Sequence, residues 1–192
     1  MTPTEILKHE HKIILLVLDA AEQGVVSIKA AGEVKVTEIE RMLEFFINFA
    51  DRCHHAKEEK LFYAKMQERG MPSNIGALAV VLKDHEFGRE KLRVVASALS
   101  QAGQGDIAAK VIIMENLTDY IGMLRAHIEK EDCILYPVGE KIFTEEDQKY
   151  LSEAFDKVEK EEMGEGVHEK YHKLAHDLSK QIRLNKPGFQ YE

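Results

Sequence analysis

Apolar residues recur along almost the whole chain at the three- and four-residue spacing of an amphipathic helix. The breaks in this pattern fall where Gly, Pro and helix-capping residues collect. We therefore expect four long helices over about residues 3–138 and two shorter ones over about residues 144–184. Long helices with short connections favour an all-α fold, an up-down-up-down four-helix bundle with one or two additional C-terminal helices. The sequence predicts a single domain, residues 1–185, followed by a tail, residues 186–192.

Capping residues predict where individual helices begin. A Thr followed three residues later by an acidic residue has the spacing of a capping box, in which side chains satisfy free backbone N–H groups. The three such pairs are Thr2 with Glu5, Thr37 with Glu40, and Thr144 with Asp147. Asp106 is the expected N-cap of the fourth helix, which we expect to reach Pro137.

The charge of the chain excludes several classes of partner. It carries 34 Asp and Glu residues against 26 Lys and Arg, a formal charge of −8, without a basic stripe. This balance argues against nucleic acid and anionic membranes as partners and favours metal cations or small molecules. Apolar runs fall short of the roughly 20 residues that span a bilayer, and the N-terminal segment does not resemble a secretory signal. We expect a cytoplasmic protein whose oligomeric state the sequence leaves open.

Two segments in different predicted helices repeat one pattern, His-x-x-Lys-Glu followed by an acidic residue. One contains His54 and Glu58, the other His127 and Glu131. Residues four apart lie on one face of an α-helix, so each pair presents an imidazole and a carboxylate to the same point. Each pair is therefore a candidate half of a metal site.

A helical wheel at about 100° per residue identifies further side chains that face the interior. His54 lies on the flank of the apolar face of its helix, whereas His55 points nearly away from it. His85 falls near the centre of an apolar stripe, and His11 flanks another. One inward histidine per helix results, and His55→Ala is predicted to retain metal.

The combined donor set favours iron. Buried imidazoles and carboxylates are costly unless they are paired, and a pair of cations would take their lone pairs. Two carboxylates able to bridge, with nitrogen donors divided between two ions, suit non-heme iron better than zinc, magnesium or calcium. We expect two Fe ions, with Mn as the alternative.

These motifs, in four successive helices, resemble the hemerythrin-like, or HHE cation-binding, family. The residues that carry the resemblance are Glu10-His11-Lys12, His54-x-x-x-Glu58, Asp84-His85-Glu86 and His127-x-x-x-Glu131. It covers roughly residues 5–140, and the combination is far more specific than any single histidine. The family implies that the four histidines are terminal ligands and that Glu58 and Glu131 bridge the two ions.

The chain departs from the oxygen-carrying members of that family at one position. They supply a second histidine one turn after the histidine of the third helix, but Arg89 stands there in this sequence. A fifth ligand could come instead from the last helix, where His168 lies nearest the apolar stripe and His172 is the alternative. The number of histidines decides which ions keep an open position for a ligand.

The sequence supports a non-heme di-iron protein that binds or senses O₂, with a small diatomic molecule or peroxide as its ligand. Two alternatives remain. One is a redox protein that reacts with peroxide or nitric oxide, and the other is an iron-responsive protein whose metal-dependent folded state is recognised by a partner protein. Whether the protein is an enzyme stays open. Beside the repeats, Tyr63 and Tyr136 are expected either to bond a ligand carboxylate or to pack in the core. Lys57 could neutralise carboxylates near the site, but the favoured expectation is that it extends its ammonium to the surface.

Overall fold

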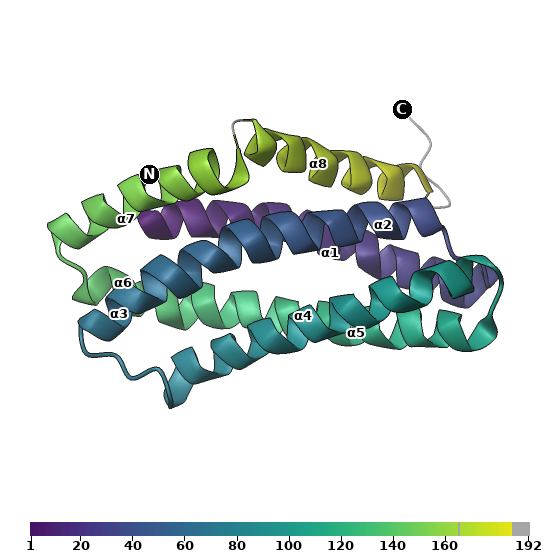
Figure 1. Cartoon of the computed structure of the whole chain (residues 1–192), viewed down its shortest axis with the longest axis horizontal. Helices are drawn as coiled ribbons and strands as arrows, with labels where there is room; N and C mark the ends of the chain where they lie inside the picture. The colour runs from purple at the N-terminus through teal and green to yellow at the C-terminus, as the bar shows by residue number, and fades with distance from the viewer. Residues whose placement is uncertain (165, 186–192) are drawn as a thin grey trace.

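The computed structural model describes residues 1–164 and 166–185, and the regular elements in these ranges are all helical, which confirms the predicted fold class. The predicted tail, residues 186–192, lies outside the described residues. Six rods follow one another along the chain (Figure 1). The first and third are the single helices α1 (Pro3–Ala31) and α4 (Gly76–Gly103).

The second and fourth rods combine α-helical and π-helical segments. The second consists of α2 (Val36–Phe45), η1 (Phe46–His55), η2 (Glu58–Phe62) and α3 (Tyr63–Glu68). The fourth consists of α5 (Ile107–Lys130), η3 (Glu131–Leu135) and α6 (Tyr136–Ile142). It continues past Pro137, because this proline stands in the first turn of α6, where a backbone N–H is not needed.

Two further rods extend the chain beyond the bundle. They are α7 (Glu145–Lys157), prolonged by η4 (Val158–Met163), and α8 (Val167–Asn185). Both lie along one side of the bundle, and α8 packs against α1 (Figure 1). Arg69, at the end of the second rod, donates to Asp147 in the first turn of α7 over 2.8 Å and so ties the two parts together.

The predicted caps are confirmed at three helices and wrong at one. Thr2 and Thr144 form their capping boxes, and the Asp106 side chain accepts from the Ala109 N–H. The second rod begins at Val36, ahead of Thr37, and its N-cap Lys35 makes no side-chain cap. The Lys35 carbonyl already accepts from the N–H of the buried Ile39, so burial of the first turn starts the helix earlier than the capping pattern indicates.

The interior contains two apolar clusters. The larger is built from residues such as Val17, Phe46, Val95 and Leu117, and the smaller from residues such as Leu7, Phe62, Leu78 and Leu135. On each of the four bundle rods, the two clusters occupy different stretches. The intervening stretches carry His11, His54, Glu58, His85 and Glu131, and His127 lies at the edge of the larger cluster, so a polar layer crosses the bundle between two apolar regions.

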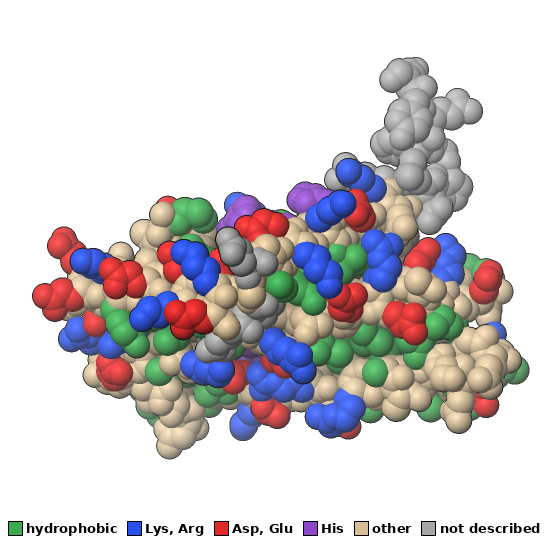
Figure 2. Space-filling view, turned by 45° about the horizontal axis from the view of Figure 1, so that its top comes forward, with side chains coloured by type: hydrophobic (Ala, Val, Ile, Leu, Met, Phe, Trp, Pro, Cys, Tyr) green, Lys and Arg blue, Asp and Glu red, His purple; other side chains and the backbone are tan. Residues whose placement is uncertain are grey.

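The surface carries charges of both signs. On the face shown in Figure 2, Lys and Arg side chains are interspersed with Asp and Glu. Within the described part of the chain, no helix combines the length and apolar character needed to cross a lipid bilayer.

Candidate metal centre

The polar layer brings the six bundle residues predicted from sequence together with one more. Their ligand atoms form two overlapping groups, each within 4.8 Å, and all seven side chains are buried. One group is His11, His54, Glu58 and Glu131; the other is His55, Glu58, His85 and His127. Glu58 belongs to both groups, and each group draws on more than one rod of the bundle.

The two carboxylates lie between histidines of different rods. Glu58 places one oxygen 3.6 Å from Nε2 of His54 and the other 3.5 Å from Nε2 of His85. Glu131 places its oxygens 3.3 Å from Nε2 of His11 and 3.1 Å from Nε2 of His127. Each carboxylate therefore faces imidazoles on two sides, as a bridging ligand must.

The other ring nitrogen of each histidine faces a carboxylate outside the centre. The Nδ1 partners are Asp132 for His11 at 2.9 Å, Glu10 for His54 at 2.9 Å, Asp51 for His55 at 3.3 Å, Glu59 for His85 at 2.6 Å and Asp84 for His127 at 3.5 Å. A carboxylate at Nδ1 orients the ring and leaves the Nε2 lone pair for a metal. Four rings are hydrogen-bonded in this way, and Asp84 faces Nδ1 of His127 without a hydrogen bond.

Tyr63 and Tyr136 combine the two roles that the sequence left open. Both are buried in the smaller apolar cluster. The Tyr136 hydroxyl donates to Glu58 over 2.5 Å, and the Tyr63 hydroxyl donates to Glu58 over 3.2 Å and also to Glu131. Two phenols therefore orient the carboxylates while they fill the core.

Without a cation, protons balance the charge of the layer. Burial raises the pKa of Glu58 well above its usual range, and the neighbouring Glu131 raises it further. Burial also acts to raise the pKa of Glu131, but His127 and His11 hold it well below its usual range. For the imidazoles of His11 and His127, burial opposes the charge, yet carboxylate partners raise the pKa to about 9 and about 10. Burial lowers the pKa of His54 to about 4.

The residues present fit a pair of metal ions. Six buried side-chain atoms of the described residues lack a hydrogen-bond partner, and four of them face the centre: Nε2 of His54 and His55, and one oxygen each of Glu58 and Glu131. The other two are Nδ1 of His127 and Nε2 of His172. Leaving a buried acceptor unpaired costs about 1–3 kcal/mol, and cations binding these lone pairs would remove that cost. Five imidazole nitrogens with two carboxylates exceed the four ligands of one structural zinc and contain more nitrogen than magnesium or calcium prefers.

The expectation that His55 points away from the site is wrong. Its side chain is only 6% exposed, and its Nε2 belongs to the second ligand group. The cause is the π-helical segment η1, whose hydrogen bonds skip one more residue than those of an α-helix. This wider hydrogen-bond spacing lowers the rotation per residue below the value of about 100° for an α-helix. His54 and His55 therefore both face inward.

His168 lies outside the two ligand groups. Its Nε2 is 3.2 Å from Oε1 of Glu10, and the side chain is 20% exposed. Glu10, Glu159 and His168 form a third group of potential ligand atoms. Lys57 lies against this group and donates to both glutamates, and it is completely buried, contrary to the predicted surface position. Its ammonium supplies the positive charge there. His172, the alternative fifth ligand, is in neither group of the centre; its ring centroid lies 4.5 Å from that of His168.

Comparison with known proteins decides the family. The family model described as the hemerythrin HHE cation binding domain matches residues 2–138. The chain belongs to this family. Its HHE segment contains all seven residues of the two ligand groups, whereas His168 lies in the C-terminal extension.

The similarity to curated relatives extends beyond the HHE segment. Uncharacterized proteins of Mycobacterium tuberculosis and Mycobacterium bovis are each 21% identical over 184 residues, which is 96% of this chain and 71% of theirs. No solved structure matches the chain significantly. The HHE chain is thus assigned as a cation-binding helical protein with His and Glu groups suited to a binuclear site.

Proposed function

We propose that this HHE protein is a non-heme di-iron protein that binds or senses O₂. The observation that carries the proposal is the pair of ligand groups that share Glu58, with unpartnered imidazole nitrogens directed into both. The chemistry of the donors favours iron, with manganese as the alternative ion. A small diatomic molecule or peroxide is the proposed ligand.

The donors are divided unequally between the two groups. We assign His55, His85 and His127 to one ion and His11 and His54 to the other, with both carboxylates shared. His55, rather than His168, becomes the fifth histidine. An iron ion held by His11 and His54 would have fewer protein ligands than its neighbour and would supply the redox chemistry that binding of a diatomic molecule needs.

The rest of the layer controls water and protons. Apolar clusters lie on both sides of the centre and keep bulk water out. Tyr63 and Tyr136 hold hydroxyl protons at the oxygens of Glu58 and Glu131, and burial with the two carboxylates raises the pKa of both phenols well above the usual range. These groups stay protonated and act as hydrogen-bond donors.

Elemental analysis combined with optical titration tests the proposal. The freshly purified protein is expected to contain two Fe per chain, and its reduced form should develop visible absorption in air that disappears under vacuum. Rapid and irreversible oxidation would favour turnover of peroxide or nitric oxide. Two tyrosine donors at the carboxylates favour that second candidate, because they place protons beside the site.

The third candidate is an iron-responsive protein that folds when metal binds and is then recognised by a partner protein. It predicts a large gain of helicity when metal binds. It is excluded if the metal-free chain melts cooperatively at nearly the same temperature as the loaded chain, measured by circular dichroism.

A further inference from the structure

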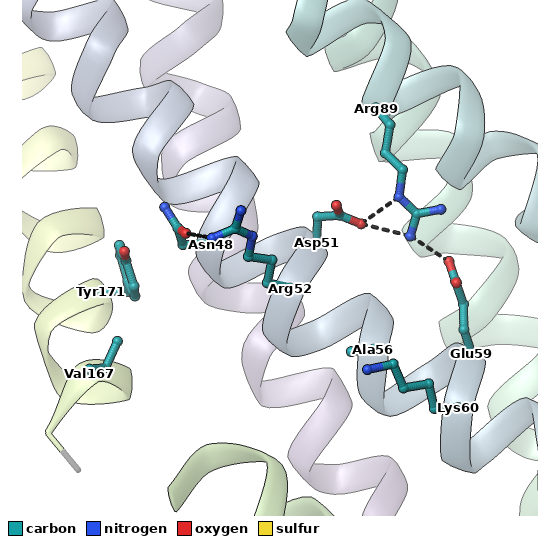
Figure 3. A pocket seen from close by; sticks show the side chains of 9 residues that line it. All are labelled: Asn48, Asp51, Arg52, Ala56, Glu59, Lys60, Arg89, Val167 and Tyr171. Carbon is teal, nitrogen blue, oxygen red and sulfur yellow. Dashed lines mark hydrogen bonds and ion pairs between the residues drawn. The ribbon is translucent and has the colours of Figure 1, made fainter. Parts of the chain in front are cut away.

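A pocket opens beside the metal centre on the outer face of the second rod. Its volume is about 490 Å³, and its walls come from the second rod, α4 and α8 (Figure 3). Asp51, Glu59 and Arg89 are among the residues that line it. Asp51 contacts Nδ1 of His55, and Glu59 contacts Nδ1 of His85. The wall of the pocket that these two carboxylates form is therefore separated from two proposed metal ligands by a single side chain.

Arg89 closes that wall. Its guanidinium donates to Asp51 over 2.8 Å and to Glu59 over 2.7 Å, which joins two carboxylates two turns apart on the same rod (Figure 3). A third contact, of 2.6 Å, holds it to the exposed Glu86 on its own helix. Arg89 is 27% exposed. It can therefore release the two inner carboxylates while it remains paired with Glu86.

A second, smaller cavity lies behind the arginine. Its volume is about 10 Å³, which is room for roughly one water-sized molecule. His55 and His85 line it, together with apolar side chains that include Leu92 and Leu124. Asp51 and Arg89 line both this cavity and the outer pocket, so these two side chains form the partition between them.

We propose that the outer pocket and the inner cavity form the entry route for a small neutral ligand, and that Arg89 is its gate. The inference rests on the proposed function, because it delivers a ligand to the same centre. A small neutral molecule loses little hydration among the apolar walls of the inner cavity, whereas an anion would lose much more and would meet Asp51 and Asp84 there as well as Arg89. Arg89 thus closes the route beside His55 and His85.

Dissolved O₂ maps the route without any metal. In the metal-free protein, paramagnetic O₂ should relax the methyl protons of Met123 and Leu124, which line the inner cavity, severalfold more than those of Ile113, which is buried in the core. Arg89→Ala should increase this relaxation. Gly88→Ala should suppress it, because a Cβ there lies 3.0 Å from Met123 Cε and 3.2 Å from Tyr120 Cε2.

Arg93→Ala is the matched control, since Arg93 lies one turn farther along α4 and is 70% exposed. It should leave the relaxation unchanged. Equal relaxation of cavity and core methyls in the unsubstituted protein would overturn the entry route, and this measurement stands even if a variant folds poorly. If Arg89→Ala and Arg93→Ala behave alike, the gate is disproved.

Ligand kinetics separate the gate from the proposed function. In the iron-loaded protein, Arg89→Ala should raise the association rate of nitric oxide, measured per bound iron pair, at least fivefold, and Gly88→Ala should lower the rate. An unchanged rate in Arg89→Ala would overturn the gate. O₂ could enhance the relaxation of the methyl protons at the inner cavity in the metal-free protein while the iron-loaded protein does not bind O₂ reversibly. That result would refute the proposed function and support the entry route.

Discussion

The imidazole rings of His55 and His85 stack, with their centroids 3.8 Å apart and their planes inclined by 15°. Asp51 and Glu59 hold their Nδ1 atoms, so the two rings present Nε2 on the same side. We predict that His55→Ala lowers metal affinity more than tenfold, because one ion loses an imidazole ligand and its ring support. Isothermal titration calorimetry with Fe²⁺ under argon measures the loss.

His176→Ala serves as the control for this variant, because His176 is exposed and belongs to neither ligand group. It should bind metal like the unsubstituted protein. Retention of two tightly bound ions by His55→Ala would show that His55 only packs against His85.

His55 also marks the limit of prediction from this sequence. A regular α-helical wheel places His11, His54, His85 and His127 inward, and three of these lie in α-helices: His11, His85 and His127. His54 and His55 both lie in the π-helical η1, where the wheel does not apply, so it places His54 correctly and fails at His55.

Other features depended on tertiary contacts that no spacing reveals. Lys57 reads as a surface lysine from its sequence, yet glutamates from α1 and η4 enclose it. Glu10 was part of a recognised motif, but its contacts with His54 and Lys57 could not be assigned before the helices were placed. The tyrosine after each ligand pair leaves a hydrogen bond to a ligand carboxylate and core packing equally open from sequence, and the structure shows both roles.

Metal binding is predicted to release protons. His11 and His127 have pKa values of about 9 and about 10 in the metal-free protein, because carboxylate partners outweigh burial. Both are protonated at pH 7 and must lose those protons to bind metal, so affinity should rise with pH and level off above about pH 10. Calorimetry in two buffers of different ionisation enthalpy should measure at least two protons released per chain, with a further contribution from Glu58, whose pKa burial and Glu131 raise.

Asp132→Asn refines this measurement. Removing the carboxylate at Nδ1 of His11 lowers the pKa of that ring, so proton release at pH 7 should decrease. Identical binding heats in both buffers would contradict the assignment of protons to His11 and His127.

Lys57→Met should destabilise the fold by about 3–5 kcal/mol, because removing one partner leaves buried charge uncompensated. Burial opposes the charge on Lys57, but Glu10 and Glu159 raise its pKa above the ordinary value and keep it protonated. Urea denaturation of metal-free protein measures the change. Lys170→Met, which removes an exposed pair with Glu44, should cost at most about 1 kcal/mol. Equal losses in the two variants would refute the buried role of Lys57.

The contact of Asp147 with Arg69 is predicted to make stability depend on pH in acid. Hydrogen bonds from Arg69 and from the Thr144 N–H hold the pKa of Asp147 well below its ordinary value. The carboxylate therefore stabilises the fold above the unfolded-state pKa of about 3.9, and this contribution is lost as the pH falls towards the folded-state value. Asp147→Asn should melt at a lower temperature at pH 7, and the difference should narrow below about pH 4.

Glu146→Gln, an exposed change in the same turn, should melt like the unsubstituted protein at both pH values. A difference between Asp147→Asn and the unsubstituted protein that stays constant from pH 7 to pH 3 would exclude ionisation of Asp147 as its origin.

The buried ammonium of Lys57 has a consequence for how the protein matures. Glu10 contacts His54 on one side and Lys57 on the other. The negative charge of Glu10 is therefore neutralised by a lysine side chain of the same protein and not by a bound cation. The C-terminal helices meet the bundle around that fixed charge through Glu159 and His168. Assembly of this outer layer needs nothing from solution, and the newly made chain can complete its scaffold first and acquire its ions afterwards.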